Sequence, residues 1–184
     1  MAQRLVLVAH APTAGTRDLI FGDRTELTAA ADIGPLAERV VSWGSGPEPA
    51  CMATARALGG EPEVIAELAG PDFGRWSGQT LTEVGTAEPE AVGAWLRDPA
   101  AAPHGGESLT ELIRRVGACC DSREWAQGRT VVVVAPLVAR AAAVHALGAA
   151  PEVIFRMDLA PLGRVGVSRA GESWRLQQLG PGVR

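Results

Sequence analysis

The chain contains no lysine and no tyrosine, so all 17 of its basic residues are arginines. Its 21 acidic residues outnumber them, and the formal net charge is -4. This balance argues against nucleic acid or an anionic membrane as the main partner. The missing lysines, together with abundant alanine, glycine, valine and proline, are typical of a GC-rich coding bias and say little about function.

Cysteine and histidine are also scarce. The three cysteines, two of them adjacent, do not make a disulfide framework, and no Cys-x-x-Cys pair occurs. The three histidines are far apart in the sequence, so we expect neither a structural zinc site nor any other metal or cofactor. These residues are Cys51, Cys119, Cys120, His10, His104 and His145.

Long hydrophobic runs are absent as well. The apolar run at residues 5–9 is too short for a signal peptide and far too short to span a bilayer. A buried first strand explains this run better. We therefore expect a cytoplasmic protein with no membrane partner.

The pattern that is present predicts alternating strands and helices in one domain over residues 1–184. Residues 4–9 and 130–135 are apolar after their first residues, Arg4 and Thr130, which is typical of strands covered on both faces. Shorter strands are expected at residues 40–43, 63–68, 153–159, 164–168 and 174–178, the last at an edge of the sheet.

Helices are expected at residues 27–39, 49–58 and 136–147, and another begins with a capping box at Ser108 and Glu111. Residues 69–106 are rich in glycine, proline and alanine, with brief helical patches at 79–84 and 87–96. We predict a three-layer α/β/α sandwich with a central, mainly parallel sheet. Residues 69–106 would form a lid-like insertion over it.

Two of the apolar strands end at positions where such a sheet builds its binding sites, His10 and Ala135. At this point the chain resembles the histidine phosphatase superfamily, which includes the phosphoglycerate mutases. The similar segments occur in the family's order and span residues 3–178. They are residues 5–13, 45–55, 72–78, 103–108 and 131–148.

The resemblance implies a catalytic role for His10, because in that family a histidine at the end of the first strand attacks the phosphoryl group. Two arginines, a second histidine and an acid complete the family's site. Here the matched positions hold Ala9, Ala50, Ala135 and Gly70. Each lost donor to a developing oxyanion commonly costs on the order of 2.7–4 kcal/mol in transition-state energy. We therefore expect phosphoryl transfer close to background.

Ligand-binding candidates come from the same matched segments: Thr13, Arg17, Asp72, His104 and Ala135. Arg17 could bind an anion or simply be solvated. Asp72 could replace the missing acid, although an aspartate before Phe-Gly is more often a turn residue. His104 could act in acid–base chemistry or belong to a flexible loop.

Three functions remain open at this stage. The first is a repurposed protein that binds a small molecule, or catalyses another reaction, in a cleft at His10 made larger and more apolar by the lost arginines. The second is an atypical phosphomonoesterase or phosphomutase with His10 as phospho-acceptor. The third is a structural or regulatory subunit. A homodimer is compatible with each of them.

Overall fold

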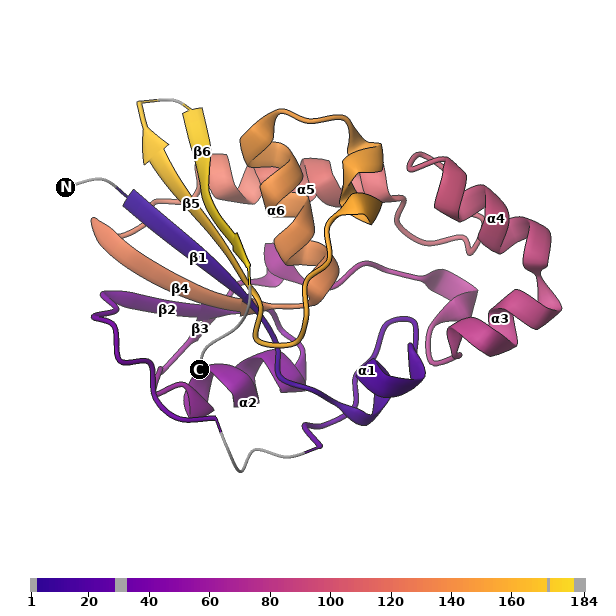
Figure 1. Cartoon of the computed structure of the whole chain (residues 1–184), viewed down its shortest axis with the longest axis horizontal. Coiled ribbons are helices and arrows are strands. Elements are labelled where there is room, and N and C mark those ends of the chain that lie inside the picture. The colour runs from indigo at the N-terminus through magenta and orange to yellow at the C-terminus, as the bar shows by residue number, and fades with distance from the viewer. Residues whose placement is uncertain (1–2, 29–32, 172, 181–184) are drawn as a thin grey trace.

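The computed structural model describes residues 3–28, 33–171 and 173–180. A six-stranded sheet with strand order β3-β2-β4-β1-β5-β6 forms its centre (Figure 1). The first four strands in this order are parallel to one another. Strand β5 is antiparallel to β1, and β6 is antiparallel to β5. The strands are β1 (Gln3–Ala9), β2 (Ser42–Ser45), β3 (Glu63–Val64), β4 (Gly128–Val134), β5 (Arg164–Ala170) and β6 (Ser173–Gly180).

Helices cover both faces of this sheet. In Figure 1, α2 lies below the sheet, and α5 and α6 lie above it. The predicted α/β sandwich is therefore confirmed. The α-helices are α1 (Ala14–Asp18), α2 (Pro49–Ala57), α3 (Leu81–Ala87), α4 (Pro89–Arg97), α5 (Leu109–Ser122) and α6 (Pro136–Leu147). Three 3-10 helices are η1 (Ala66–Leu68), η2 (Gly74–Trp76) and η3 (Pro151–Arg156).

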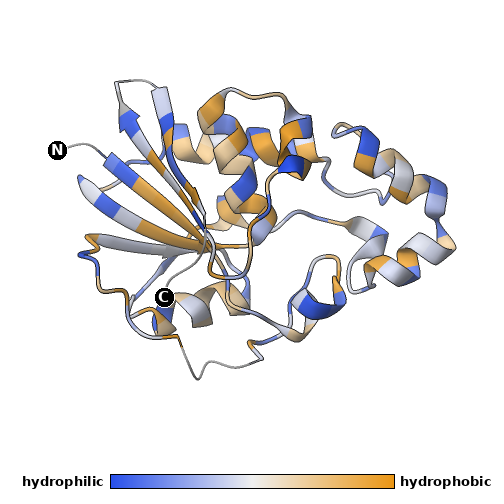
Figure 2. Cartoon of the chain, in the orientation of Figure 1, coloured by the Kyte–Doolittle hydropathy of each residue, from blue (hydrophilic) through white to orange (hydrophobic). Residues whose placement is uncertain are grey.

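The two central strands, β1 and β4, supply much of the core, and Figure 2 shows them as the most hydrophobic part of the sheet. Successive side chains of a strand point to opposite faces. Leu5 and Leu7 accordingly pack in the core on the α5–α6 side, whereas Val8 and Val133 pack against α2. Because both faces are covered, these strands are apolar throughout their second halves, at residues 5–9 and 131–134.

Several predicted elements differ from the observed ones. Residues 153–159 do not form a strand, because most of them belong to the 3-10 helix η3. The expected helix at 27–39 is absent from the described residues 27–28 and 33–39, and residues 29–32 lie outside the described part. The strand expected at 63–68 is two residues long, since η1 follows it. A short helix, α1, follows β1 at residues for which no helix was predicted.

The segment 69–106 carries α3 and α4, which lie to one side of the sheet in Figure 1. Aromatic packing joins this segment to the N-terminal part of the chain. The Phe21 ring lies 4.9 Å from that of Phe73, 5.2 Å from that of Trp76 and 5.7 Å from that of Trp95. Within the described ranges, no helix is both long and apolar enough to cross a bilayer.

Candidate functional site

The candidate site lies at the carboxyl ends of the parallel strands, where open α/β sheets place their ligands. His10 follows β1 directly, and Ala135 follows β4. The backbone amide of His10 donates to the carbonyl of Val134 at 3.0 Å, so the two strand ends are locked side by side. His10 and Ala135 are therefore neighbours at this edge, as the sequence predicted from their positions after two buried strands.

The His10 ring is held in one orientation. Its Nδ1 atom lies 2.8 Å from the carbonyl oxygen of Ala11. A carbonyl only accepts hydrogen bonds, so Nδ1 is the donor in this contact. The amide of Ala11 in turn donates to the buried hydroxyl of Thr54 at 3.0 Å. Among the described residues Nε2 has no hydrogen-bond partner, which leaves it available as a base or nucleophile.

The positions matched to the family's cationic residues carry no charge and leave little room for one. Ala9 is completely buried, and the backbone of residues 162–163 pairs with it through two hydrogen bonds. Ala50 is 4% exposed, on the face of α2 that meets the sheet. Ala135 is half-buried and begins α6 as its N-cap. A longer side chain at Ala9 would have to displace buried neighbours in the core.

A carboxylate, Glu48, reaches into this uncharged region. Glu48 is the N-cap residue of α2, yet its side chain does not cap that helix. Instead its Oε1 atom accepts a hydrogen bond of 2.6 Å from the backbone amide of Gly70. A side chain at Gly70 would begin 3.2 Å from Oε1 and 3.5 Å from the Cβ atom of Ala135. Glu48, Gly70 and Ala135 therefore converge on one spot.

A second carboxylate, Asp23, lies near His10. It accepts hydrogen bonds from the hydroxyls of Thr13 and Thr25, the latter at 2.6 Å, and from the amide of Thr25 at 2.8 Å. Burial by itself would raise the pKa of Asp23, but these hydrogen bonds and the charge of His10 more than offset it, and the pKa is lowered. Asp23 is therefore an anion at neutral pH. The Thr13 hydroxyl caps the start of α1 and donates a hydrogen bond to the Asp23 carboxylate.

Two further predicted ligand residues, Arg17 and Asp72, make their described polar contacts with residues other than His10. The Arg17 side chain is 83% exposed, and its Nε atom lies 3.8 Å from Asp18. Asp72 accepts a hydrogen bond from the amide of Gly74 at 2.8 Å, the arrangement of a turn residue. The structure thus places Arg17 in solvent and gives Asp72 a local structural role.

His104 lies inside the aromatic cluster and not on an open surface. Its ring lies 5.0 Å from that of Trp76 and 5.5 Å from that of Phe73, and the residue is 1% exposed. Nδ1 accepts a hydrogen bond from the amide of Gly106 at 3.0 Å. Burial lowers the pKa of His104. The enclosed ring packs the segment 69–106, and its Nε2 atom has no hydrogen-bond partner among the described residues. The ligand role of His104 stays a prediction.

An arginine supports the loop that carries Gly70. Arg115 forms a two-pronged ion pair with Glu107, with N–O distances of 2.8 and 2.7 Å. It also donates to the carbonyls of Glu67 and Ala69 at 2.7 and 3.1 Å. Arg115 therefore fixes the backbone next to Gly70, and with it the acceptor position of Glu48.

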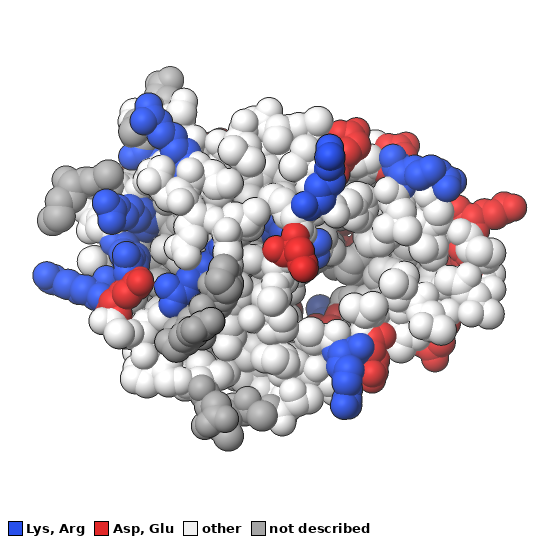
Figure 3. All heavy atoms as spheres, viewed as in Figure 1, with Lys and Arg blue, Asp and Glu red and all other residues white. Residues whose placement is uncertain are grey.

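The sequence interpretation missed Glu48 and Asp23 because it considered only positions matched to the family motifs. The sequence did contain one indication that Glu48 belongs to the site. Glu48 lies three residues after the end of a strand at Ser45 and directly before a helix. The larger, more apolar cleft stays a prediction, and two carboxylates that it did not include lie near it, Glu48 beside Ala135 and Asp23 near His10. Figure 3 shows this face hollowed next to α1, with charged atoms visible at its floor. In the described part of the chain, no group of three potential metal ligands occurs.

Comparison with known families agrees with this architecture. The model of the histidine phosphatase superfamily, branch 1, matches residues 34–181. The chain therefore belongs to this superfamily, and the family prediction is confirmed. The matched range begins after β1 and does not include His10.

Two curated relatives are similar to part of this chain. The glucosyl-3-phosphoglycerate phosphatase of Mycolicibacterium vanbaalenii is 35% identical over 127 residues, covering 61% of this chain and 56% of the relative. The bifunctional protein Rv2228c of Mycobacterium tuberculosis is 36% identical over 110 residues, covering 59% of this chain and 30% of the relative. The chain thus matches only 30% to 56% of the length of these curated relatives.

Solved structures share the fold over almost the whole chain. A mycobacterial glucosyl-3-phosphoglycerate phosphatase in complex with VO3 superposes with a TM-score of 0.78 at 25% identity, covering 96% of this chain and 98% of that one. The alpha-ribazole phosphatase from Shigella flexneri gives a TM-score of 0.78 at 18% identity, covering 98% and 99%. At such low identity the second likeness establishes the fold alone.

Proposed function

We propose that this chain is a histidine-phosphatase-fold protein whose His10 site binds a small molecule other than a phosphate dianion and does not carry out efficient phosphomonoester hydrolysis. The observation that carries the proposal is the Glu48 carboxylate, hydrogen-bonded to Gly70 at 2.6 Å beside Ala135. It stands where the resemblance would place positive charge and an acid.

Electrostatics support this reading. A phosphomonoester dianion and its transition state need several fixed donors and cations around them. The matched positions Ala9, Ala50 and Ala135 supply none, and the Arg17 side chain is 83% exposed. Two carboxylates, Asp23 and Glu48, would instead repel a dianion. An uncharged or positively charged ligand, able to donate a hydrogen bond to a carboxylate or to Nε2 of His10, suits the site better.

Binding of inorganic phosphate tests this proposal without requiring turnover. The chain has three histidines, so their imidazole NMR signals can be assigned with His10→Ala and His145→Gln. We expect no saturable shift of the His10 signals with phosphate up to about 10 mM, which corresponds to a binding free energy weaker than about -3 kcal/mol. Saturation at micromolar phosphate would overturn the proposal.

A second candidate is an atypical phosphomonoesterase that uses His10. The orientation of the ring favours it, because the bond from Nδ1 to the Ala11 carbonyl leaves Nε2 free to attack. In that case Glu48 would have to be protonated to serve as the acid. Activity that disappears in His10→Ala distinguishes this candidate from the first.

A further inference from the structure

A row of arginines crosses one face of the sheet at the amino end of β1. The even-numbered residues of β1 face the side of α2, and the first of them is Arg4. Arg4 lies opposite Arg129 of β4 on one side and opposite Ser168 of β5 on the other. Ser168 in turn lies opposite Arg175 of β6. Residues paired in this way share a face of the sheet, so Arg129, Arg4 and Arg175 form what we call the arginine row.

The arginine row lies far from the candidate site. Arg4 precedes His10 by six residues of extended chain, which corresponds to roughly 20 Å. Arg4 and Arg175 are exposed, so this part of the face is open to solvent. Figure 3 shows basic side chains gathered at this end of the molecule, whereas most of the visible acidic side chains lie on the half that carries α1, α3 and α4. The charge of the chain is therefore unevenly distributed.

Carboxylates do not balance the arginine row. Arg129 pairs with Glu38, which Arg164 shares at an N–O distance of 3.6 Å. Arg4 and Arg175 form no ion pair with any described residue. Like charges directly opposite each other on neighbouring strands, as at Arg4 and Arg129, destabilise a sheet. An anionic partner would remove this repulsion.

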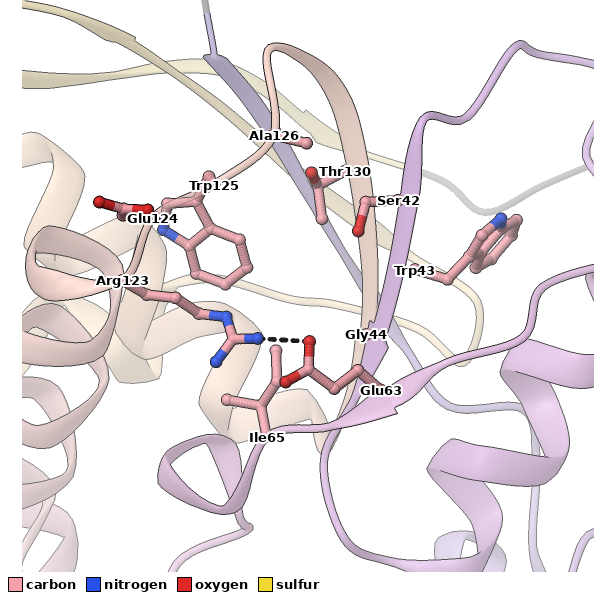
Figure 4. A pocket seen from close by; sticks show the side chains of 10 residues that line it. All are labelled: Ser42, Trp43, Gly44, Glu63, Ile65, Arg123, Glu124, Trp125, Ala126 and Thr130. Carbon is pink, nitrogen blue, oxygen red and sulfur yellow. Dashed lines mark hydrogen bonds and ion pairs between the residues drawn. The ribbon is translucent and has the colours of Figure 1, made fainter.

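Other arginines of the chain are paired. Arg123 forms an ion pair with Glu63 at 2.6 Å, drawn in Figure 4, and Arg115 forms one with Glu107 at 2.7 Å. The chain also has more acidic than basic residues, 21 against 17. The unbalanced charge of the arginine row is therefore a local feature and does not follow from a shortage of carboxylates.

The spacing of the row fits an extended peptide. The row crosses three strand spacings of about 4.8 Å, so its outer members, Arg129 and Arg175, are roughly 14 Å apart. An extended peptide places alternate side chains roughly 7 Å apart on one side, so three alternating acidic residues also span roughly 14 Å. Guanidinium groups bind carboxylates through paired hydrogen bonds, which suits such a partner.

A single-stranded nucleic acid fits this face less well, because its bases stack on exposed aromatic side chains. Seven of the eight aromatic residues belong to, or pack against, the core cluster that contains Leu5 and Leu7. The eighth, Trp43, lies on the opposite side of β2 from Trp125 in Figure 4. Trp43 is half-buried, and its ring packs against Gly60. The face therefore offers charge without a stacking platform.

We propose that the arginine row is a docking site for an extended acidic segment of another protein, with glutamate or aspartate at every second position. Three carboxylates of this segment bind Arg129, Arg4 and Arg175. Arg129 can keep Glu38, since one carboxylate does not use all the donors of a guanidinium group. The proposal does not depend on the function of the His10 site.

Titration of the intact chain with two blocked peptides of equal charge tests this site by backbone-amide NMR at about 20 mM salt. One peptide is Glu-Thr-Glu-Thr-Glu-Thr, and the other is its isomer Glu-Glu-Glu-Thr-Thr-Thr. We expect saturable shifts of β1 and β6 amides at Arg4 and Arg175 but not at His10, with a dissociation constant of about 0.1–1 mM for the alternating peptide. The isomer should bind about threefold more weakly, because it loses one exposed ion pair.

Variants assign the binding to the row. The double variant Arg4→Gln/Arg175→Gln removes two of the three contacts and should weaken binding of the alternating peptide about tenfold. Arg97→Gln/Arg114→Gln changes the net charge equally at exposed positions of α4 and α5 and should leave binding within about twofold. Without peptide, Arg4→Gln should raise the urea midpoint at low salt, because the repulsion from Arg129 is removed.

Three results would overturn the proposal. The first is equal binding of the two peptides, or a loss in Arg4→Gln/Arg175→Gln no larger than in the control. The second is a lower urea midpoint of Arg4→Gln, which would show that Arg4 serves the fold. The third is tighter binding of oligothymidylate than of the alternating peptide, lost in the double variant, which would assign the row to nucleic acid.

Discussion

The carboxylate of Glu48 accepts a hydrogen bond from the backbone amide of Gly70 at 2.6 Å. This contact joins the start of α2 to the loop after η1. It also explains why a glycine suits position 70, where a Cβ atom would come within 3.2 Å of the same carboxylate oxygen. The site thus contains a fixed negative charge that none of the matched family positions supplies.

Removing this carboxylate should weaken the fold. Glu48→Ala leaves the half-buried amide of Gly70 without its charged acceptor, so we expect the free energy of unfolding to fall by about 1–3 kcal/mol. Urea denaturation measures the change. Glu61→Ala, at an exposed position, is the control and should change stability by less than about 0.5 kcal/mol. Equal effects of the two variants would show that the Glu48–Gly70 contact contributes nothing.

Arg115 should stabilise the loop that carries Gly70. Arg115→Ala removes the ion pair with Glu107 and two hydrogen bonds to backbone carbonyls. Glu107 is then left largely buried without a partner, so we expect a loss of about 2–4 kcal/mol in the free energy of unfolding. Arg114→Ala changes an exposed neighbour on α5 and is the matched control. A loss no larger than that of Arg114→Ala would contradict the supporting role.

Asp23 should make stability depend on acid pH. Its folded pKa is lowered from 3.8, so the unfolded chain takes up the proton first as the pH falls. The stabilisation is complete well above 3.8 and is lost as the pH falls through the folded pKa. Urea titrations of wild type and Asp23→Asn should therefore differ most at pH 7 and converge towards pH 3. A constant difference across this range would contradict the assignment.

His104 should make the stability depend on pH in a higher range than Asp23 does. Burial lowers its folded pKa from 6.5, so the unfolded state binds the proton first as the pH drops below 6.5. Wild type should lose stability between pH 7.5 and the lower folded pKa. His104→Asn keeps an acceptor for the Gly106 amide and should lose less stability over the same interval. Thermal unfolding at several pH values measures both, and parallel losses would show that His104 does not titrate in this way.

The fold was predictable because its main strands and helices have local signatures. Residues 131–135 are apolar throughout, and Ser108 with Glu111 forms the capping box that begins α5. The region 153–159 was misassigned because a short apolar run fits a buried strand and a buried helical turn equally well. Pro151 at the start of η3 was the local signal for the helical alternative.

The site was predictable only in part. The place of His10 follows from the end of a buried strand, a local pattern. Glu48 and Asp23 were not found because their roles depend on tertiary contacts, one of them across 22 residues. The helix α1 was missed for a related reason. It is only five residues long, and the side chains of Thr13 and Thr16 hold its start without any apolar periodicity.

A phosphomonoesterase assay of the wild type and His10→Ala, over several substrates, tests the central claim most directly. The claim is that a site with carboxylates and without matched arginines does not transfer phosphoryl groups efficiently. We expect turnover of the wild type to be indistinguishable from that of His10→Ala. Robust wild-type turnover that disappears in His10→Ala would show that His10 is a working nucleophile, and would contradict this account of the site.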